Sequence, residues 1–160
     1  MLRNVSYEGT IQSDGNAYVA LYGWTRNPLV EWYVVEWYGA HKPCTGNDTT
    51  IQWLGNVTSD GDEYEICTKM RIEKPSIDGT ATFPQFWSVR RTHRTAGSIT
   101  TRAHFEAWTQ AGLELGKQQY MVLAVEGQDS NGTAAFTVGT PLAQTTSTVG
   151  TPPAQTASLL

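Results

Sequence analysis

Apolar and aromatic residues alternate with other residues along much of the chain, and a period of two is the pattern of β-strands. From residue 29 to residue 37, Glu31 shares a face with Tyr33, and Glu36 lies on the opposite face. A second such stretch, residues 17–24, carries Tyr18, Ala20, Tyr22 and Trp24 on one face. Strands with two different faces are predicted to build sheets that separate a core from a second environment.

Turn-forming residues punctuate these stretches and predict a series of hairpins. The turn signals lie at residues 13–16, 26–28, 59–62 and 129–132. Further strands are expected over residues 51–58, 63–71, 80–89, 118–126 and 133–138. Fifteen glycines and seventeen aromatic residues, against 16% charged residues, agree with an all-β fold.

One helix is expected to interrupt the strands. Thr100 or Thr101 can cap it, Phe105 and Trp108 recur at helical spacing as a core stripe, and Gly112 or Gly116 would end it. We assign residues 1–138 to one domain. Residues 139–160 repeat the stretch Val138–Thr145 as Val149–Thr156, are rich in Ser, Thr and Pro, and are predicted to form a disordered tail.

The composition excludes several functions. The net charge of −4 and the lack of a basic run beyond Arg90-Arg91 argue against nucleic acid as a partner. No apolar stretch is long enough for a transmembrane helix, and no secretion signal is predicted ahead of Asn4. The two cysteines have no metal-ligand spacing and the three histidines do not cluster with them, so a zinc site is not expected. The two cysteines form either a disulfide or two free thiols.

Two glutamates, Glu31 and Glu126, lie within predicted strands that are otherwise rich in Val, Leu and aromatic residues. An ionised carboxylate in such surroundings costs free energy unless it has a partner or a use. Either residue alone would be interpreted as a strand end or a salt-bridge partner. Two carboxylates on a β-scaffold are, however, the minimal equipment for hydrolysing a glycoside.

Four motifs, in this order, resemble the family 11 glycoside hydrolases, the small endo-1,4-β-xylanases. They are residues 21–31 (LYGWTRNPLVE), 75–80 (PSIDGT), 85–90 (QFWSVR) and 124–127 (AVEG). The resemblance covers roughly residues 4–138. It implies a β-jelly-roll sandwich of two twisted antiparallel sheets with one α-helix. It begins abruptly at Asn4, whereas the family has further N-terminal strands, so we expect this chain to be marginally stable and weakly active or inactive.

The resemblance also implies the roles of individual residues. Glu31 would be the nucleophile and Glu126 the general acid/base of a retaining mechanism, about 5 to 5.5 Å apart, with no metal or organic cofactor. Arg71 and Gln85 would keep Glu31 ionised, although Arg71 is equally compatible with a surface position. The aromatic residues would stack on sugar rings. The alternative is that they fill a core, but Tyr22, Trp24 and Tyr33 share strand parity with Glu31, which favours the cleft. The full set of expected substrate-binding residues is Tyr22, Trp24, Tyr33, Arg71, Pro75, Ser76, Gln85 and Trp87.

Three other positions bear on the structure. Glu36 is expected to pair with Arg90 or Arg94 and to have a structural role. Gln128 stands where the family usually has Tyr, beside the acid/base. Pro84 stands where the family usually has Thr, and because proline cannot donate a ladder hydrogen bond, we expect an edge or a bulge there.

The resulting hypothesis is internal cleavage of β-1,4-xylan with retention by a secreted monomer, with no nucleic-acid or membrane partner. The alternative is a non-catalytic xylan-binding or elicitor-like protein with an incomplete site. Because the resemblance implies secretion, and because Cys44 and Cys67 flank one predicted hairpin, a disulfide between them is expected.

Overall fold

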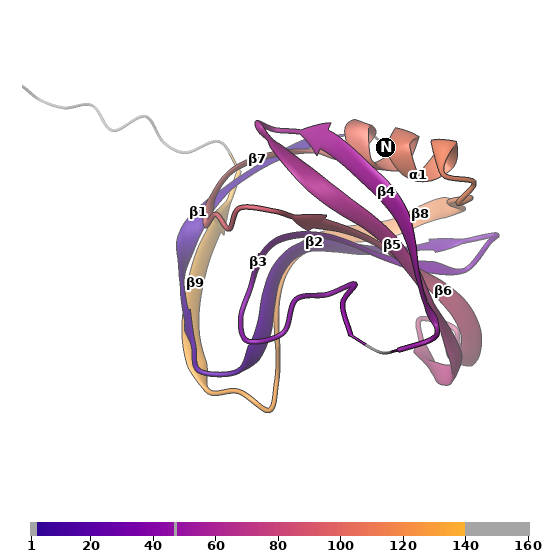
Figure 1. Ribbon diagram of the computed structural model, residues 1–160, viewed down its shortest axis with the longest axis horizontal. Coiled ribbons are helices and arrows are strands. Elements are labelled where there is room, and N and C mark those ends of the chain that lie inside the picture. The colour runs from indigo at the N-terminus through magenta and orange to yellow at the C-terminus, as the bar shows by residue number, and fades with distance from the viewer. Residues whose placement is uncertain (1–2, 47, 140–160) are drawn as a thin grey trace, which may run out of the picture.

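The computed structural model describes residues 3–46 and 48–139 (Figure 1). All of the predicted tail except Gly139 lies outside the described residues. The elements are β1 (Asn4–Ser13), β2 (Asn16–Arg26), β3 (Val30–Tyr38), β4 (Ile51–Ser59), β5 (Asp62–Ser76), β6 (Gly79–Arg90), β7 (Ala96–Thr100), α1 (Thr101–Gln110), β8 (Lys117–Gln128) and β9 (Gly132–Val138). No helix within these residues is long and apolar enough to span a membrane.

The strands form a small sheet in the order β7-β1-β9 and a large sheet in the order β4-β5-β6-β3-β2-β8. All neighbouring strands run antiparallel except β3 and β6, which are parallel. The predicted all-β fold of two sheets with one helix is therefore confirmed, with one parallel pair in place of a purely antiparallel sheet.

Two of the predicted hairpins are wrong. Residues 13–16 connect β1 to β2, and residues 129–132 connect β8 to β9, so both turns pass from one sheet to the other. In Figure 1, β1 and β9 run side by side and both bend into the large sheet at the same corner. The Asp14 carboxylate accepts a hydrogen bond of 2.6 Å from the backbone N–H of Asn131 and holds the two turns together. A turn signal marks a change of direction but does not say which strand the chain pairs with next.

The helix begins where it was predicted, but its start is held differently. The Thr100 hydroxyl donates to Asp60 at 2.7 Å instead of capping the helix, and the Thr101 hydroxyl donates to the Arg3 carbonyl at 2.6 Å. The helix ends at Gln110, and Gly112 follows with a positive φ that suits glycine. Trp108 is fully buried and packs on Trp32, which confirms its place in the core.

Pro84 lies in β6 opposite Met70 of β5. The pairing of β6 with β3 begins one residue later, at Gln85. At Pro84 the strand therefore has a neighbour on one side only, and the expectation of an edge position is confirmed.

A buried carboxylate joins the two sheets. Glu36 of β3 is fully buried and accepts hydrogen bonds of 2.6 Å from the hydroxyls of Tyr7 and Tyr64. Tyr7 belongs to the small sheet and Tyr64 to the large one. The Arg94 guanidinium completes the arrangement with an ion pair to Glu36, as predicted for one of the two candidate arginines. Arg90 contributes indirectly, because it donates to the Tyr64 hydroxyl at 2.7 Å. The structural interpretation of Glu36 is confirmed.

The sandwich is open along one side. Among the described residues, no strand pairs with the outer side of β8 or β9. Val125 of β8 lies opposite Val19 on the core-facing side, yet it is 46% exposed whereas Val19 is 0% exposed. Val138 of β9 is 54% exposed, although Tyr7, its partner on β1, is 1% exposed. Core-facing side chains are therefore left partly in water along these two edges.

His104 on α1 is a buried base. It is fully buried against the Tyr64 ring, and neither ring nitrogen has a hydrogen-bond partner within the described residues. Burial lowers the pKa of His104 to about 4, and the charges of Arg94 and Arg90 act in the same direction while Asp60 opposes them. The folded protein therefore holds this imidazole neutral.

This burial predicts acid destabilisation. An unfolded chain takes up the His104 proton near pH 6.5, whereas the folded chain does so only near pH 4. The stability contributed by the neutral ring is thus complete above about pH 6.5 and is lost as the pH falls toward 4, by about 3 kcal/mol. His104→Leu should remove this part of the pH dependence. Urea unfolding of both proteins at pH 7.5 and pH 4.5 measures it, and equal losses in the two proteins would contradict the prediction.

Candidate active site

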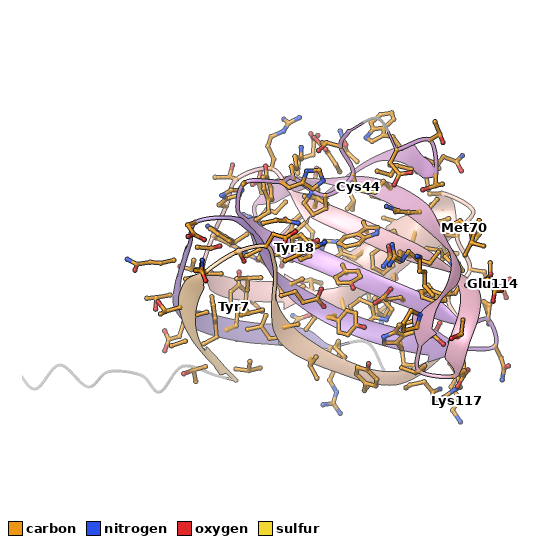
Figure 2. All side chains as sticks on the ribbon, turned by 90° about the horizontal axis from the view of Figure 1, so that it is seen from below. Tyr7, Tyr18, Cys44, Met70, Glu114 and Lys117 are labelled. Carbon is orange, nitrogen blue, oxygen red and sulfur yellow. A yellow bond between two sulfur atoms is a disulfide. The ribbon has the colours of Figure 1, made fainter. Side chains whose placement is uncertain are left out.

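A cleft of about 500 Å³ lies on the face of the large sheet that points away from the small sheet. Strand β3 shows how the two faces differ: Trp32 and Val34 belong to the core between the sheets, and Tyr33 belongs to the cleft. Tyr18 and Cys44, labelled in Figure 2, both line it. The lining residues are Asn16, Tyr18, Glu31, Tyr33, His41, Pro43, Cys44, Ile51, Cys67, Lys69, Arg71, Pro75, Phe83, Gln85, Trp87, Glu126 and Gln128.

Glu31 is a buried carboxylate with hydrogen-bond donors on both of its oxygens. It is 8% exposed, and its Oε1 accepts from the Tyr22 hydroxyl at 2.9 Å and from the Tyr33 hydroxyl at 2.8 Å. Its Oε2 accepts from the Gln85 amide at 2.6 Å, because the parallel register of β3 and β6 places Gln85 beside it. Hydrogen bonds to a carboxylate stabilise the ionised form, so these donors favour a negative charge at Glu31.

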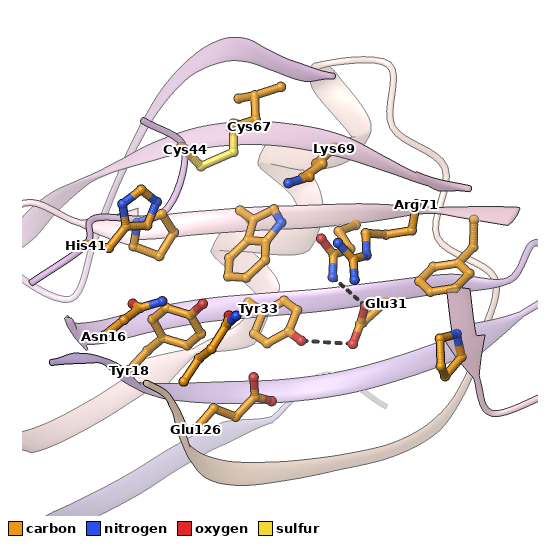
Figure 3. Close-up of a pocket in the computed structure, with 17 residues that line it drawn as sticks. Asn16, Tyr18, Glu31, Tyr33, His41, Cys44, Cys67, Lys69, Arg71 and Glu126 are labelled. Carbon is orange, nitrogen blue, oxygen red and sulfur yellow. Dashed lines mark hydrogen bonds between the residues drawn. A yellow bond between two sulfur atoms is a disulfide. The ribbon is translucent and has the colours of Figure 1, made fainter. Parts of the chain in front are cut away.

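Glu126 has the opposite surroundings. It lies on β8 opposite Tyr18 of β2 and is half-buried. None of the hydrogen bonds or ion pairs found among residues 3–46 and 48–139 involves its carboxyl group. Burial raises the pKa of Glu126, and the nearby charge of Glu31 raises it further. Figure 3 shows the two glutamate side chains pointing toward the same region beside Tyr33.

Tyr33 connects the floor of the cleft to Glu31. Its ring stacks on Trp87 at 3.9 Å with an interplanar angle of 3°. Burial and the charge of Glu31 raise the pKa of Tyr33 well above its ordinary value. The pKa of Tyr22 is raised for the same reasons. Both hydroxyls therefore stay protonated and remain donors to Glu31.

The structure brings most of the predicted site residues together. Glu31, Tyr33, Arg71, Pro75, Gln85, Trp87 and Glu126 all line the cleft. Tyr22 lies behind Glu31 with its hydroxyl on the carboxylate. Trp24 is only 3% exposed, because its ring packs on Phe83 and its Nε1 donates to the Tyr22 hydroxyl. This burial goes against the prediction that Trp24 stacks on a sugar, and it makes Trp24 a support for Tyr22.

Ser76 is the last residue of β5, at the turn into β6, and is not among the residues that line the cleft. Its hydroxyl donates to the Gly79 carbonyl at 2.6 Å and accepts from the Asp78 amide at 3.0 Å, so it closes the turn. Arg26 at the end of β2 holds the tip of this hairpin through hydrogen bonds to Asp78 at 2.7 Å and to the Ile77 carbonyl at 3.1 Å.

Several lining residues were not predicted. Tyr18 and Lys69 share the strand face of Tyr22 and Arg71, so the period of two could have identified them. His41 and Pro43 lie in the connection between β3 and β4, where no periodicity exists. A disulfide between Cys44 and Cys67 fastens this connection to β5, which confirms the expected pairing. Gln128, noted as a departure from the family pattern, does line the cleft.

Among the described residues, no group of three or more His, Cys, Asp or Glu side chains gathers in a way that could hold a metal ion.

Sequence and structure comparisons agree with this geometry. Residues 1–137 match the sequence pattern of the glycosyl hydrolases family 11. The chain belongs to this family. It is 51% identical over 136 residues to ethylene-inducing xylanase 1 of Verticillium dahliae, covering 85% of this chain and 59% of that protein. It is 48% identical over 139 residues to endo-1,4-beta-xylanase I of Cochliobolus carbonum, covering 87% and 61%.

This chain also matches a solved structure, which comes from a structural comparison of two major endo-1,4-beta-xylanases of Trichoderma reesei. The TM-score is 0.80 at 40% sequence identity, and the match covers 86% of this chain and 74% of the other. The expected family and fold are thus confirmed. The chain spans about 60% of the length of the curated relatives named above.

The open side of the sandwich and the greater length of the relatives together yield a prediction. A segment taken from ahead of the matched part of the Verticillium dahliae relative, fused before Asn4, should add strands to β8 and β9 and cover Val125 and Val138. Burying these half-exposed side chains should raise the melting temperature by about 5 °C or more.

The control is a Gly/Ser-rich segment of the same length at the same position, which cannot form an apolar strand. Thermal melting followed by circular dichroism compares the two fusions with the parent chain. Equal melting temperatures for the three proteins would show that the two edges need no further strand.

Proposed function

We propose that this chain carries the active site of a retaining endo-1,4-β-xylanase. The observation that supports this best is the contrast between the two carboxyl groups of the cleft. Glu31 is held by three donors, and Glu126 has a raised pKa and no such donors within the described residues. A carboxylate held by hydrogen-bond donors and a carboxyl group with a raised pKa in the same cleft are suited to act as nucleophile and acid.

The first step of the proposed reaction forms a covalent bond. The ionised Glu31 attacks the anomeric carbon of a xylose unit while the glycosidic C–O bond breaks. The protonated Glu126 gives its proton to the departing oxygen, which leaves as a hydroxyl group. The product is a glycosyl ester of Glu31, and its formation removes the negative charge that raises the pKa of Glu126.

The second step releases the sugar with retention. Glu126, now ionised, accepts a proton from a water molecule, and the resulting oxygen nucleophile attacks the anomeric carbon and frees Glu31. Tyr33 and Gln85 keep their hydrogen bonds available for the returning carboxylate. Arg71, Pro75 and Trp87 line the cleft and are proposed to contact the xylan chain, together with Tyr22 beside Glu31.

We further propose that the protein acts as a secreted monomer. The cleft is lined by residues of one chain. The Cys44–Cys67 disulfide fits an oxidising compartment outside the cytosol. Sedimentation of the purified protein tests whether it is a monomer. Thiol titration of protein recovered from a secretory host tests whether the disulfide forms there.

An inducing activity is a second candidate, separate from hydrolysis. The relatives from Verticillium dahliae and Penicillium digitatum are both named ethylene-inducing xylanases, and this chain is 51% and 47% identical to them. A Glu126→Ala variant that still induces ethylene as strongly as the parent would support this function. Loss of induction together with hydrolysis would leave the enzyme reaction as the single activity.

The nucleophile can be labelled directly. A 2-fluoro-xyloside with a good leaving group should form a stable ester with Glu31, because the fluorine slows the second step more than the first. Peptide mass spectrometry should place one label on Glu31. Glu31→Gln should take no label and lose at least about 10³-fold of the activity on xylan. Glu8→Gln, an exposed glutamate of the small sheet, is the matched control. A label on any other residue would refute the assignment.

The acid has a different signature. Glu126→Ala should lose about 10²- to 10⁴-fold of the activity on xylan, but much less on an aryl xyloside whose leaving group needs little protonation. Added azide should restore turnover of the aryl substrate. Because Glu126 must be protonated, activity on xylan should fall as the pH rises through its raised pKa, and Glu126→Gln should lose this limb of the profile. Equal losses on both substrates would contradict the role.

A further inference from the structure

Trp53 differs from the other tryptophans of the chain. Trp24, Trp32, Trp87 and Trp108 are at most 8% exposed and Trp37 is partly buried, whereas Trp53 is 62% exposed. None of the ring contacts found among the described residues includes Trp53. Single exposed apolar side chains are common, but a ring of this size is one of the best surfaces in a protein for holding another flat, apolar face.

The strand register places Trp53 on the cleft face of the large sheet. In the antiparallel pairing of β4 with β5, Trp53 lies opposite Cys67, and Ile51 lies opposite Lys69. Residues opposite one another share a face. Ile51, Cys67 and Lys69 all line the cleft and form one of its walls, on which Figure 3 shows the disulfide at Cys67 and the nearby Lys69. Trp53 therefore continues that wall on the outermost strand of the sheet.

The surroundings hold this position in place. Leu54 packs against the core while Trp53 stays on the cleft face, as strand alternation requires, and a bulge lies between Trp53 and Gly55. The neighbouring connection between β3 and β4 is tied to β5 by the Cys44–Cys67 disulfide and by ion pairs of 2.7 Å between Lys42 and Glu65 and 2.5 Å between Lys69 and Asp48. The disulfide and the two ion pairs thus fix the surface between the cleft and Trp53 in place.

Trp53 lies well away from the bond that would be cleaved. Three strand spacings separate β3, which carries Glu31, from β4, or about 14 Å across the sheet. A sugar that reaches Trp53 is therefore not one of the two joined by that bond. A xylopyranose ring presents C–H groups on its two faces, and these pack well against an indole.

We propose that Trp53 is a distal platform on which a xylose unit of a long xylan chain stacks after the chain has passed over the wall at Ile51 and the disulfide. The inference rests on the proposed function and extends it. It makes affinity depend on the length of the substrate, because a short oligosaccharide bound at the two glutamates does not extend to Trp53.

The test measures binding apart from turnover. In a Glu31→Gln background, calorimetry with xylotriose and with xylohexaose is compared for Trp53, Trp53→Ala and Trp53→Tyr. We expect Trp53→Ala to weaken xylohexaose binding about three- to tenfold and to leave xylotriose binding unchanged. Trp53→Tyr should restore most of the affinity, since it keeps an aromatic ring. In the active protein, Trp53→Ala should raise KM for xylan and leave kcat on a short aryl xyloside unaltered.

Val138→Ala is the matched control, because Val138 is 54% exposed on the small sheet, away from the cleft. Equal xylohexaose affinities for the parent and Trp53→Ala overturn this inference alone. An equal loss for both oligosaccharides also overturns it, because it indicates a disturbed cleft. A parent that binds neither oligosaccharide overturns the proposed function and this inference with it. A change in sedimentation with unchanged sugar binding would instead make Trp53 a contact between two copies of the chain.

Discussion

Strand β3 carries two buried carboxylates on opposite faces, and the need to give each of them hydrogen-bond donors governs much of the structure. Glu36 faces the core and accepts from Tyr7, Tyr64 and Arg94, which ties the small sheet to the large one. Glu31 faces the cleft and accepts from Tyr22, Tyr33 and Gln85. A register slip of one residue would exchange the faces and leave both charges without partners. The pairing of β3 is thereby specified by charge as well as by apolar burial.

The same strand explains why the two glutamates of the cleft differ chemically. Glu31 lies between β2 and β6, and both neighbours supply donors that favour its ionised form. Glu126 lies on β8, at the edge of the sheet, with a neighbouring strand on one side among the described residues. Burial and the charge of Glu31 act on it, and both raise its pKa. The contrast between the two carboxyl groups thus follows from their places in the sheet, with Glu31 on a central strand and Glu126 on an edge strand that β2 separates from β3.

Local patterns predicted the elements better than their connections. The alternation over residues 29–37 identified β3 and the faces of Glu31 and Glu36 correctly. The turns at residues 13–16 and 129–132 were correctly recognised, but not their role in passing between sheets, because that depends on which strands pair. Strands β1 and β7 were not predicted, and Ala96–Thr100 of β7 is too short to show a period. Trp24 was expected in the cleft because it shares parity with Tyr22, but Phe83 covers it.

The sequence by itself determined the period of two, the positions of most of the strands, the separation of the two glutamates of β3 onto opposite faces, and the motifs of the family. These are local properties, because side-chain direction along a strand depends only on the backbone. The tertiary structure alone decided which donors reach Glu31, why Glu126 has a raised pKa, how the disulfide brings His41 and Pro43 to the cleft, and which edges stay unpaired. Each of these features depends on segments far apart in the chain, and sheet order and register set the distance between such segments in space. Neither sheet order nor register is encoded in any short stretch of residues.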